Sequence, residues 1–267
     1  MTKTVEWERQ GPVSWLWMNR PEIHNAFDAG LIQELTDALG ALETDEQTRV
    51  VVLAGRGKSF SAGADLNWMR SQGGATIEEN TQDARKLGDL FLRLGQLSKP
   101  TVARVHGAAM GGGMGLAAAC SICVASTAAV FATSEVRLGL APSVISPYVL
   151  RAIGPRQAQR YFLTAERISA QRAYEIGLVH EVAPDTDLDG RVQKIITALL
   201  GGGPLAQQAS MALIRDVAGQ PVSDALVQET AERIARLRAT PEAREGLDAF
   251  LEKRPASWQA GMAQGGR

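Results

Sequence analysis

Cysteine and histidine are scarce in this chain, and neither positive nor negative charge is in excess. Its 267 residues include two cysteines and three histidines, and 28 basic side chains nearly balance 29 acidic ones, which leaves a net charge of −1. Nucleic acids and anionic membranes bind strongly basic surfaces, so this balance argues against either as a partner. With so few histidines, a metal site or a histidine-based triad has few candidate residues.

Long apolar runs are also missing, and we expect no signal peptide. The sequence has no run of 18 apolar residues that could span a bilayer, and its first ten residues, M-T-K-T-V-E-W-E-R-Q, are charged along their length. We therefore expect a cytoplasmic protein without a membrane partner. The length suffices for one large domain, or for a domain with a helical extension.

The two cysteines form a C-x-x-C motif at Cys120 and Cys123. A zinc site would need a second pair or a histidine cluster nearby, and the sequence offers neither. We therefore expect no metal and interpret both residues as buried structural thiols.

Short apolar runs alternate with segments of helical periodicity, which is typical of an α/β region. The expected strands are Val13–Met18, Val50–Ala54, Thr101–Val105, Ile122–Ala125 and Val130–Ala132. The expected helices are 29–42 with Asp28 as N-cap, 78–97, 144–152, 155–163 and 169–177. We expect no strand after these elements and a helical chain from Gly201 onward. Two apolar stripes there, Leu226–Leu237 and Leu247–Leu251, should be buried against the core or a neighbouring subunit.

A glycine-rich stretch, Val105–Gly115, follows a predicted strand with the sequence V-H-G-A-A-M-G-G-G-M-G. We interpret its glycines as a bend and the alanines after Leu116 as the start of a helix. The first amides of a helix lack intrahelical acceptors, so Gly111–Gly113 offer hydrogen-bond donors to an oxyanion or a phosphate. A tightly packed turn would explain the glycines equally well.

The same stretch matches a dinucleotide-binding motif. Gly113, Gly115 and Ala118 satisfy G-x-G-x-x-G/A, and Glu135 lies about 20 residues further on. Such a motif usually opens a domain, whereas here it lies mid-chain behind two predicted strands and two predicted helices. A nicotinamide enzyme is therefore a disfavoured but open alternative.

Two further segments have residues that could contact a ligand. The stretch Gly55–Leu66, G-R-G-K-S-F-S-A-G-A-D-L, has small residues wherever a ligand could approach the backbone. Glu135 lies on a predicted loop, Ser134–Leu140, where an acidic side chain is usually only solvated. Position alone therefore assigns no chemistry to Glu135.

The chain resembles the crotonase superfamily, the enoyl-CoA hydratase/isomerase family, in four sequence blocks that occur in the same order. These are G-K-S-F-S-A-G-A-D-L, H-G-A-A-M-G-G-G-M-G-L, F-A-T-S-E-V-R-L-G-L and F-L-E-K-R. The resemblance implies an α/β fold, a crotonase-like spiral of ββα units with a helical C-terminal region. It also implies a spiral core over residues 1–200, a helical trimerisation region over 201–260 and a disordered tail over 261–267, assembled as a homotrimer or homohexamer.

An acyl-CoA thioester is the ligand that the resemblance implies, with coenzyme A as part of the substrate and no separate cofactor. Two backbone amides of this family hold the thioester oxygen, and the matching positions are Ala64 and Gly112. The family's proton-exchanging glutamate matches Glu135. The expected CoA-binding residues are Ala62, Ala64, Asp65, Leu66, Asn67 and Gly112, with Lys58 and Lys253 close to the phosphates.

Gly115 departs from the family pattern, because familiar hydratases carry a second glutamate at the matching position. One acid can serve a hydratase, by relaying a proton from water, or a Δ3,Δ2-enoyl-CoA isomerase, by moving a proton between two carbons. A non-catalytic acyl-CoA binder is a third alternative.

The segments S-A-G-A-D-L-N-W-M and S-E-V-R-L-G-L-A-P-S-V-I-S-P-Y are similar to bacterial hydratases of branched, carboxylated enoyl thioesters, the 3-methylglutaconyl-CoA and isohexenylglutaconyl-CoA type. Glycine at position 115 would leave room for a β-substituent and remove a charge that repels a substrate carboxylate. We therefore expect a hydratase that adds water to an α,β-unsaturated acyl-CoA of this kind.

Overall fold

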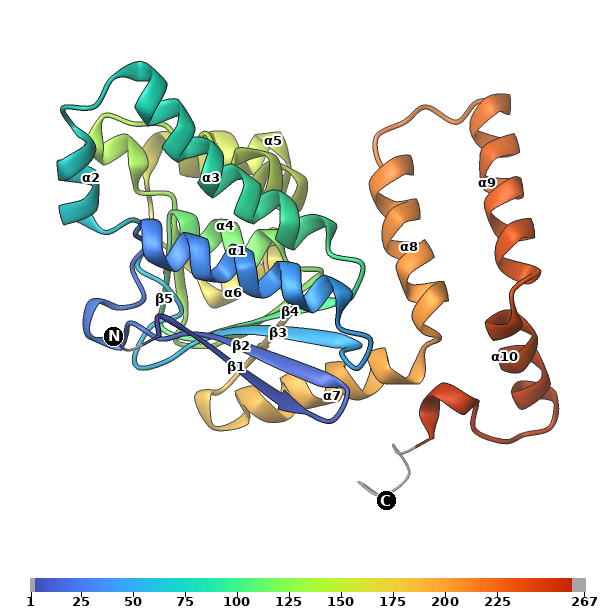
Figure 1. Cartoon of the computed structure of the whole chain (residues 1–267). Coiled ribbons are helices and arrows are strands. Elements are labelled where there is room, and N and C mark those ends of the chain that lie inside the picture. The colour runs from blue at the N-terminus through green and yellow to red at the C-terminus, as the bar shows by residue number, and fades with distance from the viewer. Residues whose placement is uncertain (1–2, 261–267) are drawn as a thin grey trace.

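A six-stranded sheet lies at the centre of the computed structural model, which describes residues 3–260 (Figure 1). Its strand order is β1-β2-β3-β4-β6-β9, in which β1 is antiparallel to β2 and the other neighbours are parallel. These strands are β1 (Val5–Gln10), β2 (Val13–Met18), β3 (Val50–Gly55), β4 (Thr101–Val105), β6 (Ile122–Ser126) and β9 (Glu181–Ala183). A second sheet, of order β5-β7-β8, contains β5 (Ala108–Met110), β7 (Val130–Ala132) and β8 (Ile168–Ser169).

Helices cover both faces of the six-stranded sheet, which explains why its central strands are apolar on both sides. Every residue of β3 is buried, as expected for a parallel strand between two helical layers. Val51 and Leu53 face α1, α3 and α4, whereas Val50 and Val52 face α7. The core helices are α1 (Ala29–Thr44), α2 (Leu66–Gln72), α3 (Ile77–Gln96), α4 (Gly112–Ala119), α5 (Ser146–Thr164), α6 (Ala170–Glu175) and α7 (Leu188–Gly201).

Local sequence signals explain several helix boundaries. The Asp28 side chain accepts a hydrogen bond from the Leu31 amide at 2.8 Å and caps α1, as predicted. Thr76 and Glu79 form a capping box that starts α3. Non-helical φ and ψ angles at Gly154 interrupt α5, so the two helices predicted over this segment are the two halves of α5.

The five predicted strands are all present, and the predicted helices correspond to α1, α3, α5 and α6. The expectation of no later strand is wrong, because β9 pairs with β6 over only three residues, too few for an alternating pattern to be recognised. A second correction concerns α4, which begins at Gly112 and not after Leu116. The glycines therefore form the first turn of this helix.

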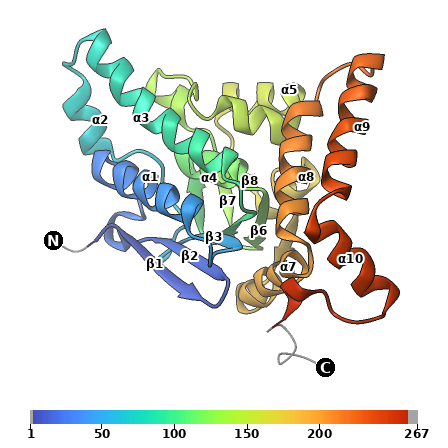
Figure 2. The same ribbon diagram turned by 45° about the vertical axis from the view of Figure 1, so that its right-hand side comes forward.

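Three helices beyond α7 form an arm that extends from the core (Figures 1 and 2). They are α8 (Pro204–Val217), α9 (Asp224–Arg238) and α10 (Pro241–Leu251). Arg49 in the core fixes the base of the arm by donating to the carbonyl oxygens of Leu200, Gly202 and Trp258 at 3.1, 2.5 and 2.9 Å. None of the helices within residues 3–260 is long and apolar enough to cross a membrane.

Most of the apolar stripes on the arm are exposed in the single chain. Leu226 is 8 % exposed, but Val227, Ile234 and Phe250 are 56 %, 46 % and 80 % exposed. Of the two predicted alternatives, burial against the chain's own core does not hold for most of these residues, and burial against a neighbouring subunit stays a prediction. The predicted disordered tail, residues 261–267, lies outside the described residues.

Both cysteines are free and buried, Cys120 at the end of α4 and Cys123 in β6. Burial raises the pKa of the Cys120 thiol to about 12 and holds the pKa of Cys123 above its usual range. The thiols therefore stay protonated at neutral pH, and the prediction of buried structural cysteines is confirmed. No group of three or more histidine, cysteine or acidic side chains within the described part of the chain is arranged to hold a metal.

Candidate active site

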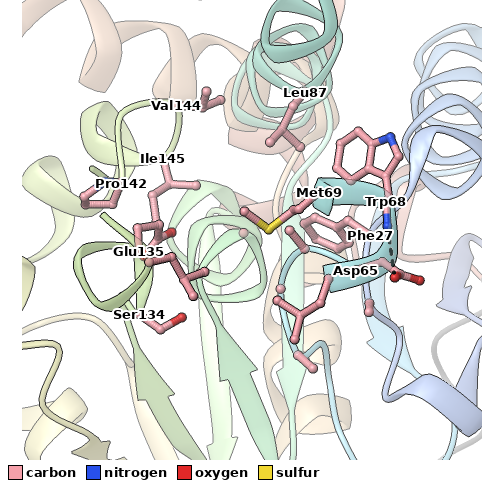
Figure 3. Close-up of a pocket in the computed structure, with 18 of the residues that line it drawn as sticks. Phe27, Asp65, Trp68, Met69, Leu87, Ser134, Glu135, Pro142, Val144 and Ile145 are labelled. Carbon is pink, nitrogen blue, oxygen red and sulfur yellow. Dashed lines mark hydrogen bonds between the residues drawn. The ribbon is translucent and has the colours of Figure 1, made fainter. Parts of the chain in front are cut away.

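A cavity of about 660 Å³ opens where segments that follow three different strands come together. Residues 62–69 follow β3, Gly111 and Gly112 follow β5, and residues 134–145 follow β7. Figure 3 shows Glu135 and Ile145 on one side of this cavity, and Phe27 and Met69 on the other. The fold thus brings Ala62, Ala64, Asp65, Leu66, Asn67, Gly112 and Glu135 to one site, as the sequence predicts.

Ala64 is held in a short parallel bridge with Phe27. The Phe27 amide donates to the Gly63 carbonyl at 2.7 Å, and the Asp65 amide donates to the Phe27 carbonyl at 2.8 Å. These bonds engage the Gly63 carbonyl and the Asp65 amide, on either side of Ala64. The Ala64 amide itself donates to no acceptor among the described residues. It is a donor available to a ligand in the cavity.

Gly112 supplies a second such donor because it is the first residue of α4. The preceding Gly111 amide donates to Ala132 at 2.8 Å, and the Gly111 carbonyl accepts from Gly115 at 3.0 Å. Within residues 3–260 the Gly112 amide has no acceptor, as expected at a helix N-terminus. We call the backbone N–H groups of Ala64 and Gly112 the donor pair.

Glu135 begins a short 3-10 helix, Glu135–Leu138, directly after β7. Its Oε2 atom is buried and has no hydrogen-bond partner in the described part of the chain. Burial raises the pKa of the Glu135 carboxyl above its ordinary value, because desolvation penalises the charged form. A buried carboxyl with an unused oxygen and a raised pKa is suited to giving and taking a proton.

Apolar side chains form most of the wall around these polar groups. Figure 3 shows Met69, Leu87, Val144 and Ile145 pointing into the cavity from α2, α3 and the segment before α5. Such a wall excludes water and lowers the local dielectric, which strengthens hydrogen bonds from the donor pair to a developing charge.

The space expected beside Gly115 does not exist. A Cβ atom on Gly115 would lie 2.4 Å from Ile145 Cγ2 and 3.0 Å from Phe91 Cε1, and Gly115 does not line the cavity. The expectation that this glycine leaves room for a β-substituent is therefore wrong, because Ile145 fills that room. Glu135 and Asp65 are the acidic residues that line the cavity.

Asp65 has a structural role in the single chain. Its carboxylate accepts from the Asn67 amide at 2.9 Å, which caps α2, and lies 3.6 Å from the Arg20 guanidinium. Leu66 and Asn67 form the first turn of α2, a helix that sequence reasoning missed because it spans only seven residues. Expected contacts between these residues and CoA stay predictions.

The two predicted lysines are not brought to the cavity. Lys58 lies before the segment that lines it, and Lys253 follows α10 on the arm, which lies across the molecule from α2 in Figure 1. Arg137 does line the cavity and was missed by sequence reasoning. The only signal for it was its position two residues after Glu135.

The dinucleotide motif is not available to a phosphate. A Cβ on Gly113 would lie 2.6 Å from the Ser61 carbonyl oxygen, so this glycine serves close packing of α4. Gly113, Gly115 and Ala118 do not line the cavity. The nicotinamide alternative is therefore wrong for this stretch, whose ligand-facing residues are Gly111 and Gly112.

Comparison of the sequence and the structure with known proteins gives matches along nearly the whole chain. The sequence profile described as enoyl-CoA hydratase/isomerase matches residues 8–261. The 2,3-dehydroadipyl-CoA hydratase of Escherichia coli is 35 % identical over 92 % of this chain and 94 % of its own. An enoyl-CoA hydratase from Shewanella pealeana is 42 % identical with a TM-score of 0.93, over 96 % of both chains. A Legionella pneumophila protein described as an enoyl-CoA hydratase/isomerase (crotonase) is 46 % identical with a TM-score of 0.92, over 97 % of this chain and 100 % of its own.

Proposed function

The chain belongs to the enoyl-CoA hydratase/isomerase family, and we propose that it is a hydratase, a lyase that adds water to the double bond of an α,β-unsaturated acyl-CoA. One observation carries the proposal. The buried carboxyl of Glu135 and the donor pair line the same largely apolar cavity, although they come from three separate segments of the chain. A proton carrier and two fixed donors are the groups that this reaction requires.

The donor pair stabilises the charge that develops during addition. When water adds to the β-carbon, electrons move through the double bond to the thioester carbonyl oxygen and form an enolate. In our proposal this oxygen accepts hydrogen bonds from the amides of Ala64 and Gly112. Removal of one such donor typically raises the barrier by about 2.7–4 kcal/mol.

Glu135 carries the proton in both halves of the reaction. As a carboxylate it takes a proton from water while the water oxygen bonds to the β-carbon. The same carboxyl then gives this proton to the α-carbon, so the enolate collapses to the 3-hydroxyacyl thioester. One O–H bond of water and the π bond of the C=C double bond break, and one C–O and one C–H bond form on the same face of the substrate.

We further propose a branched, carboxylated acyl chain, of the 3-methylglutaconyl-CoA type. Arg137 supports this choice because it is the one basic residue among the described residues that line the cavity, and no acidic side chain of residues 3–260 pairs with it. The E. coli relative is named for a dehydroadipyl thioester, which also carries a free carboxylate.

The assembly is also a proposal. Exposed apolar side chains on the arm support packing against further copies of the chain, as a homotrimer or homohexamer. In such an assembly Lys58, or Lys253 of a neighbouring copy, would neutralise a CoA phosphate.

A panel of thioesters tests the proposal. Purified protein without added nicotinamide should remove the conjugated absorbance of crotonyl-CoA and 3-methylglutaconyl-CoA and add the mass of one water. Interconversion of 3-enoyl and 2-enoyl thioesters without mass change would establish an isomerase instead. Saturable binding with neither change would establish a non-catalytic binder.

A charge-removal variant tests the acyl chain separately. Arg137→Met should lower kcat/KM for 3-methylglutaconyl-CoA by roughly 10-fold or more, because a charge-assisted hydrogen bond is lost, and leave crotonyl-CoA nearly unaffected. Arg156→Met, at an exposed position of α5 outside the cavity lining, is the matched control. Equal effects of Arg137→Met on both substrates would reject the carboxylate assignment while leaving the hydratase proposal intact.

A further inference from the structure

Phe27 contacts both halves of the donor pair. Its backbone bonds to Gly63 and Asp65, on either side of Ala64, at 2.7 and 2.8 Å. Its ring lies against Gly112, since a Cβ at Gly112 would be 2.4 Å from ring atom Cε2 and 2.8 Å from Cδ2. Phe27 is only 1 % exposed, and its ring points into the cavity in Figure 3. One buried residue therefore connects the two donors.

Among the described residues, backbone hydrogen bonds between the two segments that carry the donor pair occur only upstream of the donors. Ser61 donates to Ala108 and accepts from Met110, both at 2.9 Å. This pairing stops three residues before Ala64 and two before Gly112.

Nearer the donors, the two segments meet in two ways. Gly63 packs against Met110 and Gly111, since a Cβ on Gly63 would lie 2.8 Å from the Met110 carbonyl oxygen and 3.8 Å from Gly111 Cα, and the Phe27 ring lies against Gly112 itself. Of these two contacts, the Phe27 ring is the one made by a side chain, so a substitution can test it.

Phe27 itself is fixed by charged neighbours. Arg20 pairs with Asp28 at 2.8 Å and with Asp65 at 3.6 Å, and it donates to the Ala26 carbonyl at 2.7 Å. The Arg20 side chain is only 15 % exposed, so water screens these ion pairs weakly. Arg20 therefore holds residues 26–28 and 63–65 together.

We propose that Phe27 is a positioning residue that sets the spacing between the amide donors of Ala64 and Gly112. The inference rests on the proposed function, in which both amides bind one thioester oxygen. Two donors serve a single oxygen only if each lies about 2.7–3.1 Å from it. A displacement of about 1 Å at such a site can cost roughly 100-fold in rate.

The test replaces the ring by a smaller apolar group. Phe27→Leu should lower kcat by roughly 10- to 100-fold with KM changed less than about 3-fold, because the donors act mainly on the transition state. Phe131→Leu is the matched control, since that ring is equally buried in β7 and does not line the cavity. Denaturant titration of both variants separates a loss of stability from a loss of rate. Phe27→Met is the reserve variant if Phe27→Leu does not fold.

A spectroscopic readout isolates positioning from folding. The chromophoric thioester 4-dimethylaminocinnamoyl-CoA absorbs at longer wavelength when donors polarise its carbonyl group, so wild-type protein should produce a red shift on binding. Phe27→Leu should bind this probe with a smaller red shift, and Phe131→Leu should reproduce the wild-type shift. Wild-type kcat and a wild-type shift in Phe27→Leu would overturn the inference, as would equal losses in the control.

The probe also distinguishes failure of this inference from failure of the proposed function. It reports carbonyl polarisation and requires no turnover. A wild-type protein that red-shifts the absorbance of the probe but hydrates no enoyl-CoA would reject the hydratase proposal. The positioning role of Phe27 would still stand if Phe27→Leu gave a smaller red shift than wild type. A wild-type protein that binds the probe without any shift would reject the donor pair, and the positioning role with it.

Discussion

The cavity and the arm depart from ordinary protein packing in opposite ways. In the cavity a carboxylate oxygen of Glu135 is buried without a hydrogen-bond partner among residues 3–260. On the arm, apolar side chains such as Phe250 and Leu251 are 80 % and 68 % exposed. A buried polar group costs free energy unless it is paired, and a large exposed apolar surface costs free energy unless it is covered.

The two regions differ in the kind of molecule that would satisfy their unpaired groups. A small polar ligand satisfies an unpaired carboxyl and two backbone donors, whereas another protein surface satisfies an apolar helix face. The core is already closed by helices on both faces of its sheet. We therefore expect changes in the cavity to alter chemistry, and changes on the arm to alter assembly.

The largest effect is expected from Glu135→Gln. The amide keeps the shape of the side chain but cannot carry the proton, so kcat should fall by about 10²–10⁴-fold while the substrate still binds. Stopped assays with substrate in excess measure the residual rate. Glu78→Gln, at an exposed position of α3, is the control. Wild-type turnover in Glu135→Gln would mean that another residue is the acid.

Ala64→Pro should have the next largest effect. Proline removes the Ala64 N–H, and loss of one oxyanion donor typically lowers kcat by about 10²–10³-fold. Ala64→Gly keeps the N–H and should keep most of the activity. The assignment of Ala64 fails if the proline variant folds normally, by circular dichroism, and retains full kcat.

Gly115→Ala should destabilise the fold. The new methyl group would meet Ile145 at 2.4 Å, and overpacking of this kind costs about 1–3 kcal/mol in the free energy of unfolding. Adding Ile145→Ala should recover part of that loss. Gly88→Ala in α3 is the control, because its Cβ would meet nothing closer than 4.0 Å. Equal stability of Gly115→Ala and wild type in urea would show that Ile145 moves freely.

The pH dependence of hydration should follow the ionisation of Glu135. Only ionised Glu135 accepts a proton from water, and burial raises its pKa, so hydration should decline with falling pH at values above the ordinary glutamate pKa of about 4.3. The folded state binds this proton more tightly than the unfolded state. Stability should therefore decrease as pH rises from the ordinary pKa through the raised one. Carboxyls outside the cavity whose pKa values are lowered, such as Glu245, contribute with the opposite sign in both proteins. Urea titrations across this range should therefore show the decrease as a fall in the free energy of unfolding of wild type relative to Glu135→Gln.

Substitutions on the arm should change the stability of the single chain least. Phe250→Asp with Leu251→Asp places charges on an exposed apolar face, so the free energy of unfolding of the core should change by less than about 0.5 kcal/mol. Assembly should weaken instead, which sedimentation velocity measures. A wild-type protein that sediments as a monomer at micromolar concentration would contradict the proposed trimer or hexamer.

Sequence predicts those features that depend on residues close together in the chain. The capping of α1 by Asp28 and the burial of β3 follow from local pattern, and both are confirmed. The contact between Gly115 and Ile145 joins residues 30 positions apart, so no local pattern indicates it. The unpaired oxygen of Glu135 likewise depends on how β7 and α4 pack in three dimensions.

Family resemblance supplied what local patterns could not, namely the prediction that Ala64 and Gly112 act together, and both residues line the cavity. Neither local pattern nor family resemblance predicted Arg137, because its position in the cavity depends on the 3-10 helix that begins at Glu135. The orientation of the arm was not predicted from the sequence either. It depends on the hydrogen bonds of Arg49 to residues about 150 and 210 positions away.

Both members of the donor pair are main-chain atoms, and this affects how the protein tolerates sequence drift. A point mutation exchanges a side chain and leaves every N–H in place, proline excepted. The anion-stabilising half of the site is thus encoded by the course of the backbone and by the few residues that hold it in place, Phe27 and Gly112 among them, whereas proton transfer depends on the side chain of Glu135 alone. In the proposed mechanism, a mutation of Glu135 can therefore alter the reaction while both backbone donors that hold the intermediate stay in place.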